Sequence, residues 1–156
     1  METIVPQLRR TAWHEAGHVV AAHLMGWTLG AARISPDDWS GSTEAAPPAC
    51  VTLRDHLVML HAGDLGANLS EIEAQGDDMA AARDWRKIHD ELEAAFPDDN
   101  EAQVGEWRAA EKIARDLLNR HRPAVERIAE ALLRSPAHAL SGDQIAALLV
   151  APTGDL

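Results

Sequence analysis

The first 25 residues carry the pattern that most restricts how this chain can fold. Apolar residues recur there at the spacing of one helix face, namely Ala16, Val19, Val20 and Leu24. This spacing predicts a helix from about Leu8 to Met25, with Gly26 as a C-terminal stop. The same stretch contains the sequence His14-Glu15-Ala16-Gly17-His18. Because residues four apart in a helix lie one turn apart on nearly the same face, the two histidines are predicted to point the same way.

Further segments with helical periodicity follow, separated by breaks that contain Pro or Gly. They predict helices at about 53–68, 78–95 and 101–120, one starting at Pro123, and a last one ending at Leu149. The segment at about 78–95 has a predicted apolar stripe of Met79, Ala82, Trp85, Ile88 and Leu92. Residues 28–50 contain several prolines and predict a short β hairpin or edge strand, then a loop. The predicted fold is mainly α, a compact helical domain over residues 1–156 with the hairpin or edge strand beside the first helix.

Composition limits the classes of function. The chain has 156 residues, 46% of them apolar, which suits one domain with a real core. Its net charge of −11 argues against nucleic-acid binding, which needs clustered Lys and Arg. Cys50 is the only cysteine, so a disulfide within the chain and a zinc cluster built on cysteines are both excluded. The sequence predicts no membrane span and no signal peptide, and we therefore expect a cytoplasmic protein.

The histidine pair predicts a metal site. Zinc takes nitrogen and oxygen ligands in a tetrahedral array, and a catalytic zinc keeps one position for water. His14 and His18 are predicted to bind one zinc ion together, and Glu15 is predicted to act as the base for the zinc-bound water, the nucleophile. Gly17 adds a second signal, because a glycine inside a helix costs about 1 kcal/mol relative to alanine. Either a close approach by another backbone or by substrate, or simply tight helix packing, would offset that cost.

A third protein ligand is needed, and the residue pattern leaves its identity open. The metzincin class is excluded, because Ala21 and Leu24 occupy the positions where that class has Gly and His. His23 is five residues beyond His18 and is predicted to point away from the metal. The remaining candidates are Glu44, His56, His61, Glu71, Glu73, Asp77, Asp78 and His89. Asp77 and Asp78 open a predicted helix, where an acidic residue more often serves as a cap.

The sequence resembles the peptidase domain of the FtsH family of AAA+ zinc proteases. The HEAGH motif, the segments ARISP, LVMLHAGDLGANL and AQGDDMAAARDW, and the C-terminal stretch from Arg122 to Leu149 occur in the family's order. The resemblance covers about residues 9–150. It implies that His14 and His18 are zinc ligands, that Glu15 is the catalytic base, and that Asp78 is the third ligand, with Asp77 if the register shifts by one. It also implies an edge strand near residues 31–35 beside the cleft. Two interpretations of that strand stay open: an extended substrate pairs with it near Arg33 and Ile34, or the strand only packs against the core.

The motor of that family is missing. Lys87 and Lys112 are the only lysines, and neither lies in a Gly-Lys-Ser/Thr phosphate loop. We therefore expect a zinc-dependent, ATP-independent peptidase that acts on flexible polypeptides, either alone, as a homo-oligomer or with a partner protein that supplies substrate. The alternative is a non-enzymatic protein-interaction module that zinc stabilises. A weaker third hypothesis is a hydrolase of non-peptide amides, because the motif does not specify the scissile bond.

Overall fold

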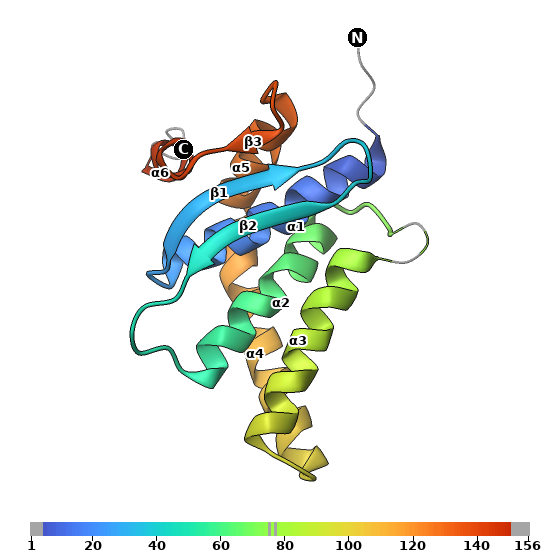
Figure 1. Cartoon of the computed structure of the whole chain (residues 1–156), viewed down its shortest axis with the longest axis vertical. Coiled ribbons are helices and arrows are strands. Elements are labelled where there is room, and N and C mark those ends of the chain that lie inside the picture. Colours follow the sequence, from blue (N-terminus) through green and yellow to red (C-terminus); the bar gives the residue numbers. More distant parts are fainter. Residues whose placement is uncertain (1–4, 75, 77, 151–156) are drawn as a thin grey trace.

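Helix α1 (Pro6–Leu24) runs through the middle of the structure, a computed structural model that describes residues 5–74, 76 and 78–150. The other elements follow in the order β1 (Thr28–Ile34), β2 (Gly41–Ala46), α2 (Leu53–Leu69), α3 (Met79–Ala95), α4 (Asn100–Arg120), α5 (Arg122–Arg134), β3 (Ala139–Leu140) and α6 (Gly142–Val150). Figure 1 shows the small sheet on one side of α1 and helices α2, α3 and α4 on the other. The prediction of a mainly helical fold with a small β element is confirmed, and the predicted helix boundaries hold to within about two residues.

Helix α1 is buried on nearly all sides. Residues 12–17 and 19–22 are all buried, and the apolar ones join a core cluster with the sheet and α5. Pro6 stands in the first turn, where its missing N–H costs nothing, and Gly26 follows the helix with a φ of 77°. Burial of this kind is normal for alanine and valine but not for His14 and Glu15, which are each 3% exposed. Polar side chains in such a place need specific partners.

The sheet is antiparallel, with the strand order β2-β1-β3. Arg33 pairs with Ser42 of β2 on one side and with Ala139 of β3 on the other. The region of Arg33 and Ile34 is therefore the middle of the sheet, and the prediction that an extended substrate pairs there is wrong. The free edge that faces the α2–α3 side belongs to β2. Strand β3 is two residues long and was not predicted, because so short a segment has no periodicity to detect.

Helices α2, α3 and α4 share a second apolar cluster, in which Leu57, Ile88 and Ala110 are fully buried. Thr52, Asp78 and Asp99 cap these helices, each accepting a hydrogen bond from a backbone N–H three residues later. The predicted stripe on α3 is only half right. Ile88 and Leu92 are buried, but Met79 and Trp85 are 68% and 46% exposed. The buried face is formed by Ala81, Asp84, Ile88 and Leu92.

Helices α1 and α2 approach each other closely through glycines. A Cβ on Gly17 would lie 2.1 Å from the carbonyl oxygen of Ala62, and a Cβ on Gly66 would lie 2.6 Å from the carbonyl oxygen of Trp13. No side chain fits at either position. Tight packing against another backbone therefore accounts for the glycine within the HEAGH motif. The contact fixes α2 against the face of α1 that carries the histidines.

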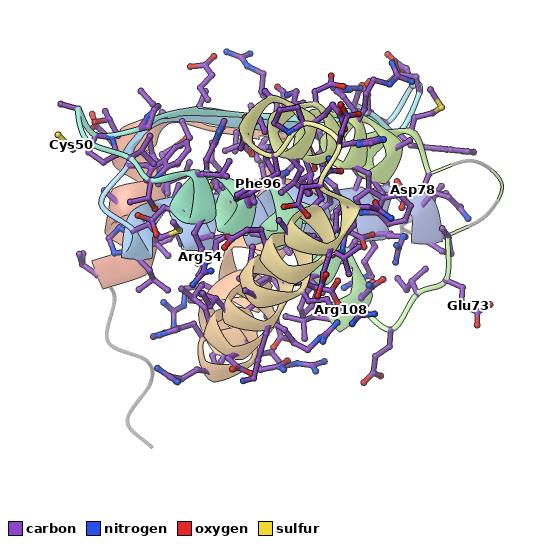
Figure 2. All side chains as sticks on the ribbon, turned by 90° about the horizontal axis from the view of Figure 1, so that it is seen from below. Cys50, Arg54, Glu73, Asp78, Phe96 and Arg108 are labelled. Atoms are coloured by element: carbon purple, nitrogen blue, oxygen red, sulfur yellow. The ribbon has the colours of Figure 1, made fainter. Side chains whose placement is uncertain are left out.

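Two features concern the outside of the molecule. Cys50 is exposed in the connection between β2 and α2, as Figure 2 shows. Among the residues that the structure describes, we find no helix with the length and apolar character that crossing a membrane requires.

Candidate metal centre

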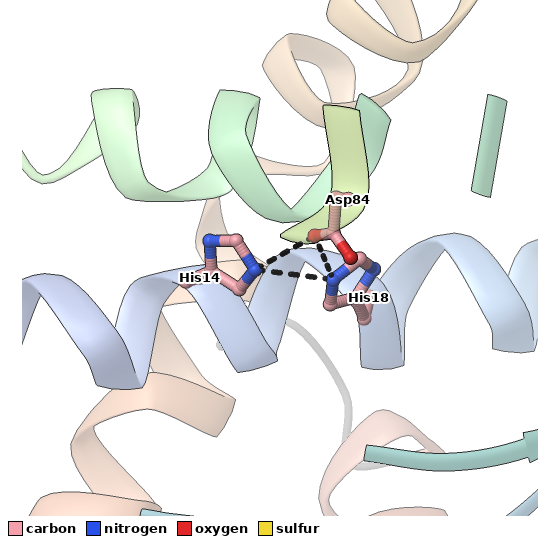
Figure 3. Close-up of side chains that lie close together, drawn as sticks. All are labelled: His14, His18 and Asp84. Carbon is pink, nitrogen blue, oxygen red and sulfur yellow. Dashed lines mark hydrogen bonds and ion pairs between the residues drawn. The ribbon is translucent and has the colours of Figure 1, made fainter. Parts of the chain in front are cut away.

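His14 and His18 lie one turn apart on α1 and point the same way, as the sequence predicts. Their Nε2 atoms are 3.2 Å apart, and their rings are nearly perpendicular at a centroid distance of 4.9 Å. Figure 3 shows the two Nε2 atoms converging on one point above the helix. Such a convergence of two nitrogens leaves room for one acceptor or one cation between them.

Asp84 of α3 completes the group. Its Oδ2 atom is 3.0 Å from Nε2 of His14 and 3.0 Å from Nε2 of His18. Figure 3 shows this carboxylate entering from the helix opposite. One atom from each of the three side chains thus lies within a single small triangle, and the group could hold a metal ion. All three side chains are at least 88% buried.

The geometry fits a tetrahedral ion. Zinc binds histidine nitrogen and carboxylate oxygen at about 2.0–2.2 Å, so two ligand atoms of a tetrahedral site lie about 3.3 Å apart. The three distances in this group are 3.0, 3.0 and 3.2 Å. Two imidazoles and one carboxylate also match the ligands of catalytic zinc sites, which leave a fourth position open.

Gly63 of α2 leaves the space that such an ion would need. A Cβ at this position would lie 2.4 Å from Nε2 of His18 and 2.5 Å from Nε2 of His14. A side chain here would therefore occupy the place where the two nitrogens converge. The φ of Gly63 is not positive, so the backbone of α2 would accept another residue at this position. Glycine is needed here because of the nearby histidine nitrogens.

Outer hydrogen bonds orient the histidines. Nδ1 of His18 lies 3.0 Å from the carbonyl oxygen of Met59, to which it can donate. A proton on Nδ1 leaves the Nε2 lone pair for a metal, as in most histidine ligands. Nδ1 of His14 is buried and has no hydrogen-bond partner in the described part of the chain.

The charges of the group are strongly coupled. Burial raises the pKa of Asp84, but hydrogen bonds from His14 and His18 outweigh it and hold that pKa well below its usual range. Burial lowers the pKa of His18, but the hydrogen bond and charge of Asp84, together with the charge of Glu15, raise it overall. The Asp84 carboxylate is thus ionised, and it favours a positive charge beside it. Either a proton on a histidine nitrogen or a bound metal cation could supply that charge.

The Glu15 carboxylate points toward strand β2. Its Oε2 atom accepts a 2.6 Å hydrogen bond from the hydroxyl of Thr43. A Cβ on Gly41 would lie 2.5 Å from Oε1 of Glu15, so the glycine lets the strand pass over the carboxylate. Glu15 lines one cavity of about 270 Å³ together with His14, His18 and Asp84. The structure thus brings a carboxylate base and the metal-binding group to the same space.

The structure does not bring Asp78 to the histidines. Asp78 is the N-cap of α3, where Oδ1 accepts from the backbone N–H of Ala81 at 3.0 Å. Its Oδ2 lies 3.2 Å from the guanidinium of Arg10, and Figure 2 shows it at the beginning of the helix. Asp84 is six residues further along α3, about 9 Å at the rise of an α-helix. The fallback, Asp77, lies outside the described residues.

Of the remaining predicted candidates, none that the structure describes joins this group of ligand atoms. His56 pairs with Glu91, and the ring of His61 packs edge-on against Trp107. Glu44 accepts from the backbone N–H of Ala31, while His89, Glu71 and Glu73 are exposed. Asp84 itself was missed, although the sequence carries a signal for it. It follows Ala81 by three residues and precedes Ile88 by four, so it interrupts an apolar helix face with a charge that needs a buried partner.

Comparison with protein-family models finds no family that matches this chain, and no curated protein sequence matches it. The relation to the FtsH family therefore stays a prediction from the HEAGH motif and the order of the segments after it.

Proposed function

We propose that this protein is a zinc-dependent peptidase that hydrolyses peptide bonds in flexible polypeptides without ATP, as an FtsH-like peptidase domain would. The observation that most supports the proposal is the cavity that His14, His18 and Asp84 line together with Glu15. A metal group alone would suit a structural site. A peptidase also needs a carboxylate at the same space to accept and return a proton, and Glu15 supplies it.

In this mechanism His14, His18 and Asp84 would hold the ion. When bound, zinc would supply a Lewis acid that lowers the pKa of a water molecule to about 7 and polarises the scissile carbonyl. Glu15 accepts the proton of the attacking water and then gives it to the leaving amine. The hydrogen bond from Thr43 fixes the Glu15 carboxylate, which leaves its Oε1 atom, beside Gly41, for this proton transfer.

Strand β2 is the place where a substrate backbone would bind. Its residues Gly41, Ser42 and Thr43 line the same cavity as the metal-binding group. β2 is an edge strand, and an extended peptide can add to such an edge through main-chain hydrogen bonds. This position replaces the one near Arg33 that the sequence suggested.

The test compares the wild type with Glu15→Gln. Zinc content is measured first. Cleavage of an unstructured protein is then followed without a chelator, with a chelator, and again after zinc is added in excess of the chelator. We expect both proteins to bind zinc, and Glu15→Gln to lose cleavage by at least about 100-fold, the usual contribution of a general base. Glu126→Gln, an exposed change on α5, is the control and retains activity.

Two results would contradict the proposal. If the Glu15→Gln variant cleaves as fast as the wild type, Glu15 is not the catalytic base. A wild type that binds zinc but cleaves no member of a broad peptide library would favour the alternative, an interaction module that the metal stabilises.

A further inference from the structure

A pair of basic residues stands beside the metal centre. Ala80, Arg83, Asp84 and Lys87 of α3 all line the cavity of the metal-binding group. Their spacing places them on one face of the helix. Asp84 is buried and reaches the histidines, whereas Arg83 and Lys87 are exposed. Arg83 also lines the neighbouring cavity of about 150 Å³, so it stands where the two cavities meet.

No neighbouring carboxylate of the described chain matches the charges of these two cations. The chain has 14 basic residues against 25 acidic ones, and six of the Arg and Lys side chains that the structure describes lie at ion-pair distance from a carboxylate, as Arg54 does from Glu106. Within the described residues, no carboxylate lies at ion-pair distance from Arg83 or Lys87. Two exposed cations one helical turn apart at the lining of a cavity, with no carboxylate partner, would attract an anion there.

The other charges at the cavity do not cancel this pair. Glu15 of α1 and Asp84 of α3 are the carboxylates among its lining residues, and together they would offset the charge of one divalent ion. His56 of α2 also lines the cavity, and it is paired with Glu91 at 2.6 Å. Arg83 and Lys87 therefore place two positive charges on the α3 side of the cavity.

We propose that Arg83 and Lys87 bind a carboxylate of the substrate close to the scissile bond. This inference rests on the proposed function and adds a substrate class to it. The β2 edge would hold the peptide backbone on one wall of the cavity, and the two cations would receive the carboxylate on the opposite wall. That carboxylate belongs either to an Asp or Glu side chain or to the C-terminus of the peptide.

Binding to the zinc-loaded Glu15→Gln protein tests this without any need for cleavage. The probes are acetylated, amidated heptapeptides of neutral sequence, the same peptides with one Glu moved along the sequence, and neutral peptides with a free C-terminal carboxylate. We expect at least one carboxylate position to bind about fivefold or more tightly than the neutral peptide. The preference should weaken with added salt, because both cations are exposed.

Variants assign the preference to residues. Adding Arg83→Gln and Lys87→Gln should remove it and leave binding of neutral peptides nearly unchanged. Arg86→Gln is the matched control, because Arg86 is exposed on the same helix but lines neither cavity. Equal affinity for the carboxylate and neutral peptides would overturn the inference, as would a preference that survives the double substitution.

The same peptides, given to the wild-type enzyme, separate this inference from the proposed function. Cleavage without a carboxylate preference in binding or in KM would leave the peptidase standing and remove the role of Arg83 and Lys87. A carboxylate preference in binding that depends on both cations, with no cleavage of any peptide, would support the anion site and contradict the peptidase.

Discussion

Asp84 is only 7% exposed, so its negative charge is buried. Its partners are two histidine nitrogens, each at 3.0 Å from the carboxylate. A buried charge is costly unless it is paired or binds a metal. Asp78, by contrast, is partly exposed and does the ordinary work of a helix cap. Asp78 and Asp84 thus have different roles, which substitution can separate.

Asp84→Ala should weaken zinc binding by about 100-fold or more. Removal of a residue that only hydrogen-bonds to a metal ligand already lowers metal affinity by about 10- to 100-fold. Asp78→Ala should bind zinc as the wild type does and lose about 1 kcal/mol of unfolding free energy, the usual value of an N-cap. Competition with a chromogenic chelator and urea unfolding give the two quantities. The opposite ranking of the two variants in zinc affinity would restore Asp78 as the ligand.

At the scale of residues, the sequence predicted His14, Glu15 and His18 because their spacing along one helix is a local property. The third member of the group, Asp84, lies 66 residues after His18 in the sequence, on another helix. Local spacing cannot show which residue of that helix faces the histidines. The apolar stripe predicted for α3 was rotated about the helix axis relative to the face that is buried, toward Met79 and Trp85. A stripe centred on Ala81 and Ile88 would have placed Asp84 on the buried face.

At the scale of elements, the site depends on how closely α1 and α2 pack. The backbones meet at Gly17 and Gly66, and this contact brings Met59 to the ring of His18 and Gly63 to the convergence of the two Nε2 atoms. The helices were predictable from their periodicity and caps. The central position of β1 was not, because pairing with a two-residue strand over 100 residues away leaves no pattern in the sequence.

Gly17→Ala should destabilise the protein by about 2 kcal/mol or more, because the new methyl group would lie 2.1 Å from a backbone oxygen that cannot move aside cheaply. Gly105→Ala is the matched control, since that helical glycine has nothing within 4 Å of an added Cβ. The control should gain up to about 1 kcal/mol from helix propensity. Urea unfolding measures both, and equal stability of the two variants would show that the α1–α2 contact is less tight than described.

For the whole molecule, His61 links pH to stability. It is buried on α2 with its ring against Trp107 of α4, and its Nε2 has no hydrogen-bond partner in the described structure. Burial lowers the pKa of His61, because it disfavours the charged imidazolium. The folded state therefore binds fewer protons here than the unfolded state, so stability is full above a pH of about 6.5 and falls as the pH drops through that value.

His61→Leu should reduce the loss of unfolding free energy between pH 7.5 and pH 5.5, since leucine has no proton to take up. Urea unfolding at both pH values, in the presence of a chelator, isolates this effect from metal binding. His23→Gln, an exposed change on α1, is the control and should keep the pH dependence of the wild type. A variant of His61 with an unchanged pH dependence would contradict the role given to its burial.

The partners of the metal-binding group belong to different parts of the core. α1 packs in the cluster that contains the sheet and α5, whereas α3 packs in the cluster of α2 and α4. An ion held between His18 and Asp84 would close a loop of 66 residues, as a covalent cross-link does, and would restrict the unfolded chain in the same way. Metal binding would then add directly to folding free energy. A larger supply of zinc in the surroundings would therefore raise the free energy of unfolding, and with it the lifetime of the protein.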